Sequence, residues 1–410
     1  MRILIYGINY APELTGIGKY TGEMAEWLAK KGHEVHVITA MPYYPEWKVH
    51  EKYKGKKWFT EVLNDVHVHR CPMYVPAEVN SKKRIIHEFS FVLSTSVYWM
   101  KFLFGKKFDI VFCIAPPFHL GYNPVFYKFF RRSRLIYHIQ DLQVDAAKDL
   151  GMINNRAFLN LMFGMEKWLM KKSTKVSSIS NGMIKKIKAK GIPDSKIIFF
   201  PNWVDDAVVY PLSKEDSLRR ELNIDMETKV ILYSGNLGEK QGLEIIIEAA
   251  KEYLNNKDIL FLICGSGGGK EKLMQLANDA GLQNIRFLPL QPYEKLSALL
   301  AVADIHLVLQ KKSAADLVMP SKLTGILAAG GYALVAAEKG TSLYEVIDTY
   351  QAGAIIEPES VYSLKEGIAQ AVGNPQNFLQ VKKNAREYAE KFLAKEHILH
   401  NFGQELERIV

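Results

Sequence analysis

One stretch of the chain combines three glycines, an asparagine and a lysine between an apolar run and a helical pattern. It reads "YSGNLGEKQGLE" (233–244), follows "KVIL", and contains Gly235, Asn236 and Lys240. Glycines let backbone N–H groups face a ligand, and the helix that follows adds a positive dipole at its N-terminus. These residue types in this order indicate a site for a phosphate group. The alternative is a tight corner between a strand and a helix, for which glycine is also suited.

A second loop of the same kind lies near the start of the chain. "GINYAPELTGIGKYTGE" (7–23) follows a short apolar strand pattern and places Gly16 and Gly18 directly before a helix. Neither this loop nor the first has the spacing G-x-G-x-x-G, so an ordinary dinucleotide site is not indicated.

A third glycine-rich turn, "GSGGGK" (265–270), contains Gly265 and Gly267. It is not a P-loop, because that motif requires glycine where Cys264 stands and serine or threonine where Glu271 stands. It remains a turn at the carboxyl end of a strand, which is the edge where open α/β sheets bind ligands.

A lysine begins the apolar helical pattern of "DLVMPSKLTGILAAGG" (316–331). Lys322 follows Ser321, and an ammonium beside a helix N-terminus is well placed to meet a diphosphate as a point charge. By itself Lys322 would be interpreted as a solvated surface residue. Together with the glycine loops at 235 and 265, the phosphate interpretation is favoured.

Polar side chains also follow a strand pattern in the first half of the chain. "YHIQDLQVDAA" (137–147) is expected to place His138, Gln140 and Asp141 just past the end of that strand. A histidine or aspartate at such an edge can orient a sugar hydroxyl or take part in proton transfer, so His138 and Asp141 are the candidate catalytic residues. The alternative is that Asp141 caps the helix that follows.

Strand and helix patterns alternate along the whole chain, which predicts an α/β fold with largely parallel sheets. The first series begins with a strand at 2–7 and ends near "PNWVDDAVVYP" (201–211). A second series then repeats the order of strand, glycine loop and helix. Two Rossmann-like domains are therefore predicted, 1–203 and 204–391, followed by a helix at about 392–410 that could belong to either.

The composition indicates the cellular compartment and the kind of partner. Three widely spaced cysteines form neither a zinc pattern nor a disulfide framework, and the start lacks the features of a signal peptide, so a cytoplasmic, reducing location is expected. The net charge of +9 calls for an anionic partner. Because the basic residues are dispersed, a membrane surface or a phosphate-rich substrate is favoured over nucleic acid. No D-x-D and no Cys/His ligand pattern occurs, so neither a metal ion nor another cofactor is expected.

The segment Lys82 to Lys107 is both basic and apolar. Its uncharged run, Phe89 to Met100, is too short to span a bilayer, which takes about 20 residues. As a helix it is expected to carry a narrow polar stripe through His87, Ser90, Ser94 and Lys101. It is either an ordinary buried helix or an interfacial one flanked by charges that attract lipid.

Taken together, these motifs resemble a known family, the retaining GT-B glycosyltransferases of family 4. The likeness is greatest to bacterial enzymes that add fucose or N-acetylfucosamine to colanic acid and O-antigen repeat units, and it covers nearly the whole chain. It rests on eight motifs in the family's order: "YAPELTGIGKY", "IQDLQVDAAKDLG", "ISNGMIKKIKAKGI", "PNWVD", "YSGNLGEKQGLE", "GSGGGKEKL", "ADIHLV" and "MPSKLTGILAAGG".

The resemblance implies two Rossmann domains facing a cleft, with the acceptor on the first domain, the nucleotide-sugar on the second, and a last helix that packs back on the first. The substrates it implies are a GDP- or UDP-sugar and a glycan acceptor, which the basic segment suggests is linked to polyprenyl diphosphate at the inner face of the membrane. The positions it implies around the donor diphosphate are Gly235, Asn236 and Lys240, with Ser321 and Lys322 opposite and Gly16 and Gly18 on the other side. It places Gly265 and Gly267 near the nucleotide base.

The chain departs from the family pattern in three places. Asn236 stands where an arginine is widespread, Gln241 stands where a lysine is usual, and the paired glutamates are replaced by Leu317 and Gly325. Two other readings therefore stay open. A sugar-nucleotide 2-epimerase of the same architecture would need carboxylates near the loops, and a non-catalytic protein would bind nucleotide-sugar or glycan without transferring it.

Overall fold

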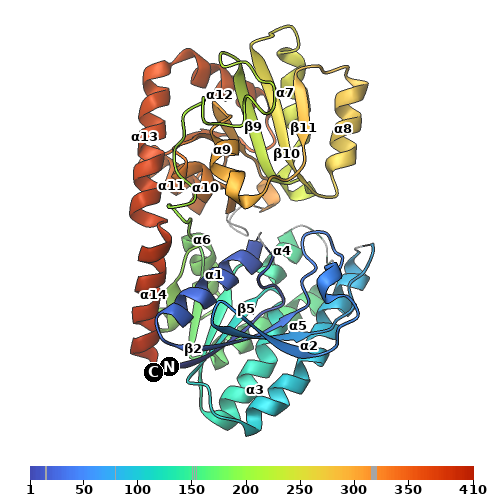
Figure 1. The fold of residues 1–410 in the computed structure, drawn as a ribbon, viewed down its shortest axis with the longest axis vertical. Helices are drawn as coiled ribbons and strands as arrows, with labels where there is room; N and C mark the ends of the chain where they lie inside the picture. Colours follow the sequence, from blue (N-terminus) through green and yellow to red (C-terminus); the bar gives the residue numbers. More distant parts are fainter. Residues whose placement is uncertain (14–15, 79, 150, 152, 154, 315–320) are drawn as a thin grey trace. The chain divides into compact units, whose positions relative to one another are not determined.

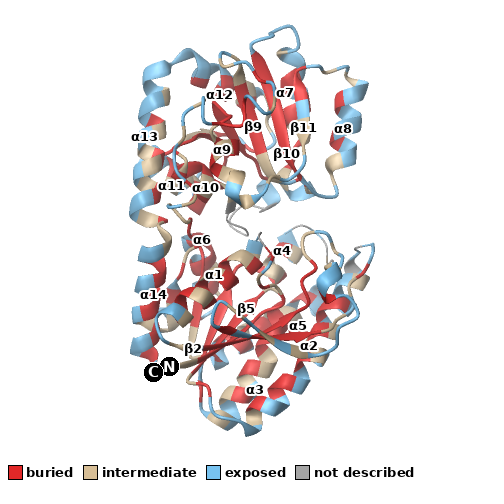
Figure 2. Ribbon diagram, in the orientation of Figure 1, coloured by how far each residue is buried: buried red, intermediate tan, exposed pale blue. Residues whose placement is uncertain are grey.

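The computed structural model describes residues 1–13, 16–78, 80–149, 151, 153, 155–314 and 321–410. The chain divides into two units, which are described separately (Figure 1). Unit 1 comprises Met1–Pro201 together with Leu399–Val410, and unit 2 comprises Asn202–Ile398. In both units the buried residues follow the strands of a central sheet (Figure 2).

The sheet of unit 1 has the strand order β3-β4-β2-β1-β5-β6-β7-β8, in which only β3 runs antiparallel to its neighbour. Its strands are β1 (Arg2–Tyr6), β2 (Glu34–Ala40), β3 (Phe59–Leu63), β4 (Val66–Cys71), β5 (Ile110–Ala115), β6 (Arg134–Ile139), β7 (Lys175–Ser178) and β8 (Ile197–Phe199). The central strands are apolar and buried along their length, as expected for parallel strands covered on both faces.

The helices of unit 1 cover both faces of this sheet. They are α1 (Gly16–Lys30), α2 (Ser81–Phe104), α3 (Tyr122–Arg131), α4 (Gln143–Asp149), α5 (Arg156–Lys172) and α6 (Asn181–Ala189), with α14 (Lys395–Ile409) contributing its residues from Leu399 onward. On one face Tyr6 stacks on Phe91 and meets Trp99, both of α2. On the other face Phe112 of β5 meets Phe402 of α14.

The sheet of unit 2 is parallel throughout, with the order β11-β10-β9-β12-β13-β14. Its strands are β9 (Lys229–Asn236), β10 (Ile259–Ser266), β11 (Ile285–Leu288), β12 (Ile305–Val308), β13 (Tyr332–Ala336) and β14 (Ala354–Ile356). Its helices are α7 (Glu244–Glu252), α8 (Lys270–Asp279), α9 (Leu296–Leu300), α10 (Ser321–Ala328), α11 (Ser342–Tyr350), α12 (Val361–Gly373) and α13 (Pro375–Phe392). Alternation along β9 sends Ile231 and Tyr233 toward α7, α8 and α12, and Val230 and Leu232 toward α9.

The predicted α/β fold with largely parallel sheets is confirmed. The glycine loops follow β1, β9 and β10, so each lies at the carboxyl edge of its sheet, where parallel strands direct their loops to one side. The sequence patterns did not identify β3, β4, β13 or β14. Within the described residues, no helix combines the length and the apolar character needed to cross a bilayer.

Candidate functional site

In unit 2 the carboxyl ends of β9 and β10 are in register, so their glycine loops lie against each other. Gly265 pairs with Gly235 and Ser266 with Asn236. A Cβ at Gly265 would lie 1.9 Å from the carbonyl oxygen of Gly235, and one at Gly267 would lie 2.6 Å from Oδ1 of Asn236. Gly265 and Gly267, which were expected near a nucleotide base, are therefore glycines because the two loops pack backbone against backbone.

Lys322 in the first turn of α10 reaches the same edge. Its ammonium nitrogen lies 3.6 Å from the centre of the Tyr233 ring, and a Cβ at Gly235 would lie 3.2 Å from it. The residue is half-buried, yet the nitrogen itself is buried and finds no hydrogen-bond partner among the described residues. The ring of Tyr233 is held in place by its own hydroxyl, which donates to the carbonyl of Asn236.

A buried ammonium without a hydrogen-bonded partner is unfavourable, and burial accordingly lowers the pKa of Lys322 to about 7. Its place in the first turn adds to the cost, because the positive end of a helix dipole repels a cation. The contact with the Tyr233 ring offsets part of this cost. An anion bound beside Gly235 would supply the missing partner, so the geometry fits a phosphate group.

Two further lysines lie in the loops that follow β9 and β12. Lys240 is exposed, and its carbonyl oxygen accepts a hydrogen bond from the backbone N–H of Lys311, which joins the loops after β9 and β12. The Lys311 side chain packs beside Gly242, whose φ of +61° favours glycine. Neither lysine takes part in a salt bridge with a described residue. Lys311 was missed by the sequence reading, because only the position of the loop after β12 brings it beside Gly242.

Asn236 and Ser321 complete the donor-side positions predicted for unit 2. The side chain of Asn236 is exposed and lies close to Gly238 and Gly267, where the absence of Cβ atoms leaves room for it. Ser321 begins α10, and its side chain lies outside the part of the chain that the structure describes. Unit 2 thus brings together Gly235, Asn236 and Lys322, with Lys240 at the rim.

In unit 1 the glycine loop after β1 is held by a buried carboxylate. Glu13 accepts hydrogen bonds from the backbone N–H groups of Tyr43 and Tyr44, both at 3.0 Å, and from the Asn9 side chain at 2.9 Å. Burial raises the pKa of Glu13, and these N–H donors oppose that rise. A Cβ at Gly18 would lie 2.9 Å from the Glu13 side chain, so Gly18 makes room for Glu13. Glu13 was not among the predicted residues, although it is the one acid of "APELTGIGK".

Asp141 lies after β6 at the same edge of unit 1 and is half-buried. Burial, and then the charges of Glu13 and Asp141, raise the pKa of Tyr44, which places these groups in one neighbourhood. Gly16 begins α1 with a φ of +58° and lies next to the Tyr44 ring. The structure therefore brings Gly16, Asp141, Tyr44 and Glu13 together. Of these, the Asp141 carboxylate and the Tyr44 hydroxyl can form hydrogen bonds with the hydroxyl groups of a ligand.

The placement of His138 differs from the prediction. It lies inside β6 rather than past its end, and only 2% of it is exposed. Its ring stacks on Phe112 and packs on Phe200, Nδ1 lies 2.9 Å from the Ser177 hydroxyl, and burial lowers the pKa of His138 to about 3. The prediction that His138 lies just past the end of the strand is therefore wrong, because its ring lies within β6 and fills the core.

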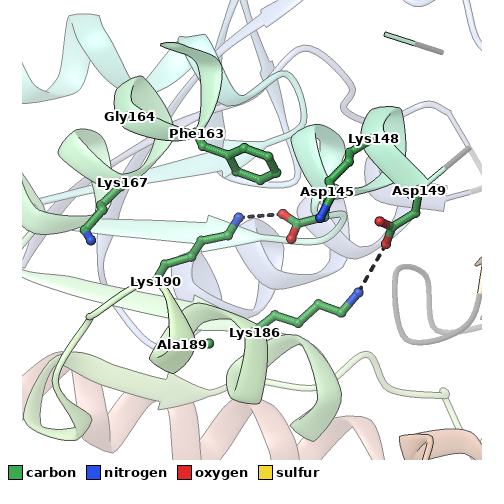
Figure 3. Close-up of a pocket in the computed structure, with 9 residues that line it drawn as sticks. All are labelled: Asp145, Lys148, Asp149, Phe163, Gly164, Lys167, Lys186, Ala189 and Lys190. Atoms are coloured by element: carbon green, nitrogen blue, oxygen red, sulfur yellow. Dashed lines mark hydrogen bonds and ion pairs between the residues drawn. The ribbon is translucent and has the colours of Figure 1, made fainter. Parts of the chain in front are cut away.

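A surface hollow of about 520 Å³ lies between α4, α5 and α6 of unit 1 (Figure 3). Lys190 pairs there with Asp145 of α4 and Glu166 of α5, and Lys186 pairs with Asp149 at 3.6 Å. Most of its charges are therefore already neutralised. The ion pairs around the hollow join α4 to α5 and to the C-terminal part of α6. Among the described residues, no group of three or more metal-ligating side chains could hold an ion.

Comparisons with known proteins indicate the family of the chain. The glycosyl transferase 4-like domain matches residues 15–203, and glycosyl transferases group 1 matches residues 214–391. The chain is 44% identical over 408 residues to WcaI of Escherichia coli K12, which is provisionally named a colanic acid biosynthesis glycosyl transferase; the match covers 98% of each protein.

Solved structures show the same fold. A sucrose-phosphate synthase from Thermosynechococcus elongatus superimposes with a TM-score of 0.79 at 15% identity, covering 100% of this chain and 98% of that one. HepE of Anabaena, solved in complex with UDP-glucose, gives 0.74 at 14% identity and covers 100% of both chains. Two family matches that span most of the chain, and a relative 44% identical over 98% of it, show that this protein belongs to the GT-B glycosyltransferases.

Proposed function

We propose that this glycosyltransferase moves a sugar from a nucleoside-diphosphate sugar to a hydroxyl of a glycan acceptor, with retention of anomeric configuration and without a metal ion. The observation that carries the proposal is the ammonium of Lys322, buried beside Gly235 with no hydrogen-bond partner among the described residues. A diphosphate at this edge would supply the missing negative charge.

The barrier to such a transfer is the departure of a diphosphate from a carbon that becomes oxocarbenium-like. Lys322, the amides of the loop at Gly235 and the N-terminus of α10 would stabilise the charge that develops on the leaving group. Because binding raises the affinity of Lys322 for a proton, the lysine would be fully charged only when the diphosphate is present. A leaving phosphate oxygen can then accept the proton of the acceptor hydroxyl.

The acceptor hydroxyl is proposed to bind in unit 1, near Asp141 and Tyr44. Asp141 is assigned a positioning role, because its carboxylate lies at the edge where Glu13 fixes the backbone at Tyr44. Asp141→Asn should lower kcat for transfer at least tenfold while leaving nucleotide binding unchanged. Loss of nucleotide binding in this variant would contradict the assignment.

The sugar and the pathway are inferred from relatives. WcaI is named for colanic acid biosynthesis, and a sugar of the fucose or N-acetylfucosamine type is the favoured donor group, carried by GDP or UDP. The acceptor is proposed to be a glycan linked to polyprenyl diphosphate at the inner face of a bacterial membrane, in exopolysaccharide or O-antigen synthesis. HepE binds UDP-glucose, which supports a nucleotide-sugar as the donor class.

A thermal-shift panel tests the donor site. UDP-, GDP- and dTDP-sugars and their free diphosphates are added with and without Mg²⁺ to the wild type and to Lys322→Met. A ligand at 100 times its Kd stabilises the folded state by about 2.7 kcal/mol. A shift with one nucleotide that is independent of Mg²⁺ and lost in Lys322→Met supports the proposal. Equal shifts in wild type and variant would overturn the role of Lys322, and no shift with any nucleotide would overturn the donor site.

A further inference from the structure

Helix α2 is apolar on two opposite faces, and the sheet of unit 1 covers only one of them. The covered face contains Phe91, Tyr98, Trp99 and Phe102, all buried. Only part of the polar stripe expected along this helix faces solvent, because His87 and the Ser94 hydroxyl are buried whereas Lys101 is exposed. Helices that are apolar all round are normally enclosed on all sides. Helix α2 is not enclosed.

The uncovered face forms one stripe along the helix. Its side chains are between 51% and 80% exposed and recur every three or four residues, which places them on one side of a helix. They are Ile86, Phe89, Leu93, Val97, Met100 and Phe104, with Ile85 beside the first of them.

Helix α3 extends this stripe into a wider surface. Phe126, Phe129 and Phe130 are each more than half exposed, and the ring of Phe130 contacts the other two. Arg131 joins the ends of the two helices, since its guanidinium donates to the carbonyl oxygens of Leu103 and Gly105. The uncovered faces of α2 and α3 are called the apolar surface below.

The charge around the apolar surface is strongly positive. The segment 81–134 contains ten Lys and Arg residues but only two acids. Both acids are engaged: Glu88 is buried and accepts from Arg84, and Asp109 accepts from the backbone N–H of Arg2. Lys82, Lys101 and Lys107 are exposed and form no salt bridge with any residue that the structure describes. This charge fits an anionic partner.

The length of the stripe favours a partner with a flat, extended surface over one with a narrow groove. From Ile85 to Phe104 it extends about 29 Å at 1.5 Å per residue. Trp58 lies against the middle of α2, where its indole N–H donates to the carbonyl oxygen of Ser94 while the ring is 43% exposed. An apolar stripe of this length, with basic flanks and a tryptophan at its margin, has the composition of an element that lies in the plane of a membrane interface.

We propose that the apolar surface of α2 and α3 docks on an anionic phospholipid bilayer, with the stripe inserted among the acyl chains and the lysines against the headgroups. The proposal rests on the proposed function in that the acceptor is lipid-linked. Near the N-terminus of α2, His87 packs on Tyr43, whose backbone N–H is bonded to Glu13. A sugar carried by a lipid beside this end would therefore meet the edge that holds Asp141.

Vesicle co-sedimentation of the full chain tests the proposal, using phosphatidylethanolamine with phosphatidylglycerol and, separately, pure phosphatidylcholine. Leu93→Asp and its matched control Leu379→Asp are compared, because Leu93 on α2 and Leu379 on α13 are 73% and 67% exposed. Leu93→Asp should weaken binding to anionic vesicles by roughly tenfold or more, since it replaces a leucine that would enter the acyl chains with a charged residue. Leu379→Asp should bind like the wild type. Lys101→Glu should lower binding by roughly fivefold or more, and added salt should weaken binding further.

Donor binding separates this proposal from the proposed function. Leu93→Asp should keep the nucleotide-induced thermal shift, and Lys322→Met should keep vesicle binding. Equal vesicle binding by Leu93→Asp and the wild type would overturn membrane docking while leaving the donor site intact. A change of sedimentation coefficient in Leu93→Asp without any change in vesicle binding would overturn it too, because the surface would then be an interface between two copies of the chain.

Discussion

Replacing Lys322 by methionine should make the unliganded protein more stable, because it removes an amine that burial forces to give up its proton and keeps an apolar stem. The pKa of Lys322 is lowered from 10.5 to about 7 by burial. The folded state therefore binds fewer protons than the unfolded state between these two values, and stability rises with pH in that window. From the two pKa values, the cost of Lys322 to the folded state is about 4 kcal/mol at pH 7.5 and about 2 kcal/mol at pH 9.

Part of that cost is offset by the Tyr233 ring, so the expected gain in Lys322→Met at pH 7.5 is about 2 to 3 kcal/mol. For a unit of this size the gain corresponds to a rise in Tm of roughly 5 °C or more. Differential scanning calorimetry at pH 7.5 and pH 9 should show a difference between variant and wild type that shrinks by about half. Lys257→Met, at an exposed position of unit 2, should show no difference at either pH.

The same variant should lose the thermal shift caused by a nucleoside diphosphate. A variant that is more stable without ligand and binds the ligand more weakly identifies a side chain that destabilises the free protein but interacts favourably with the bound ligand. If Lys322→Met were less stable than the wild type at both pH values, the ammonium would be favourably placed without a ligand. The electrostatic reasoning for the donor site would then be refuted.

Three further changes follow from the packing of the loops and the core. Gly265→Ala should abolish the nucleotide-induced thermal shift, because its Cβ would lie 1.9 Å from a backbone oxygen of the neighbouring loop. Gly268→Ala should retain the shift, because nothing lies within 4 Å of its Cβ; equal nucleotide binding by both variants would contradict the packing argument. Glu13→Ala should lower the free energy of unfolding of unit 1 by about 2 to 3 kcal/mol in urea titrations, because it strands buried N–H groups, and Glu13→Gln should cost less. Burial lowers the pKa of His69 to about 3, so the free energy of unfolding should fall as the pH drops below about 6.5. In His69→Phe the Tm should therefore vary less between pH 7 and pH 5. An unchanged slope of Tm against pH would show that His69 is not the group responsible.

Much of the fold was accessible from local pattern. Alternating strand and helix signals predict the parallel sheets, and the glycine loops fall at the carboxyl ends of β1, β9 and β10 as expected for a fold of this kind. The edge strand pair β3 and β4 was missed, because each strand has only five or six residues and the strand-like alternation in β4 was not recognised.

For the candidate site, the sequence predicted only which positions take part. The sequence marks Lys322 and Gly235 as residues suited to phosphate, but it does not report that a buried tyrosine ring lies under the ammonium. Glu13 looks like any loop acid until the fold brings Tyr43 and Tyr44 to it across 30 residues. His138 is the opposite case, because a residue that was predicted to be catalytic lies in the core. The strand pattern does not show that Phe112 and Phe200 pack against its ring.

The sequence by itself determined the α/β class, the order of the glycine loops and the family that those motifs indicate, because each depends on residues close together along the chain. The tertiary structure alone decided which apolar faces are covered, which charges are buried and which glycines make room for backbone. Those properties depend on contacts between distant segments. Helix α2 shows the difference: its sequence predicts a helix that is apolar apart from a narrow polar stripe, but only the fold shows that the sheet covers one apolar face and leaves another exposed.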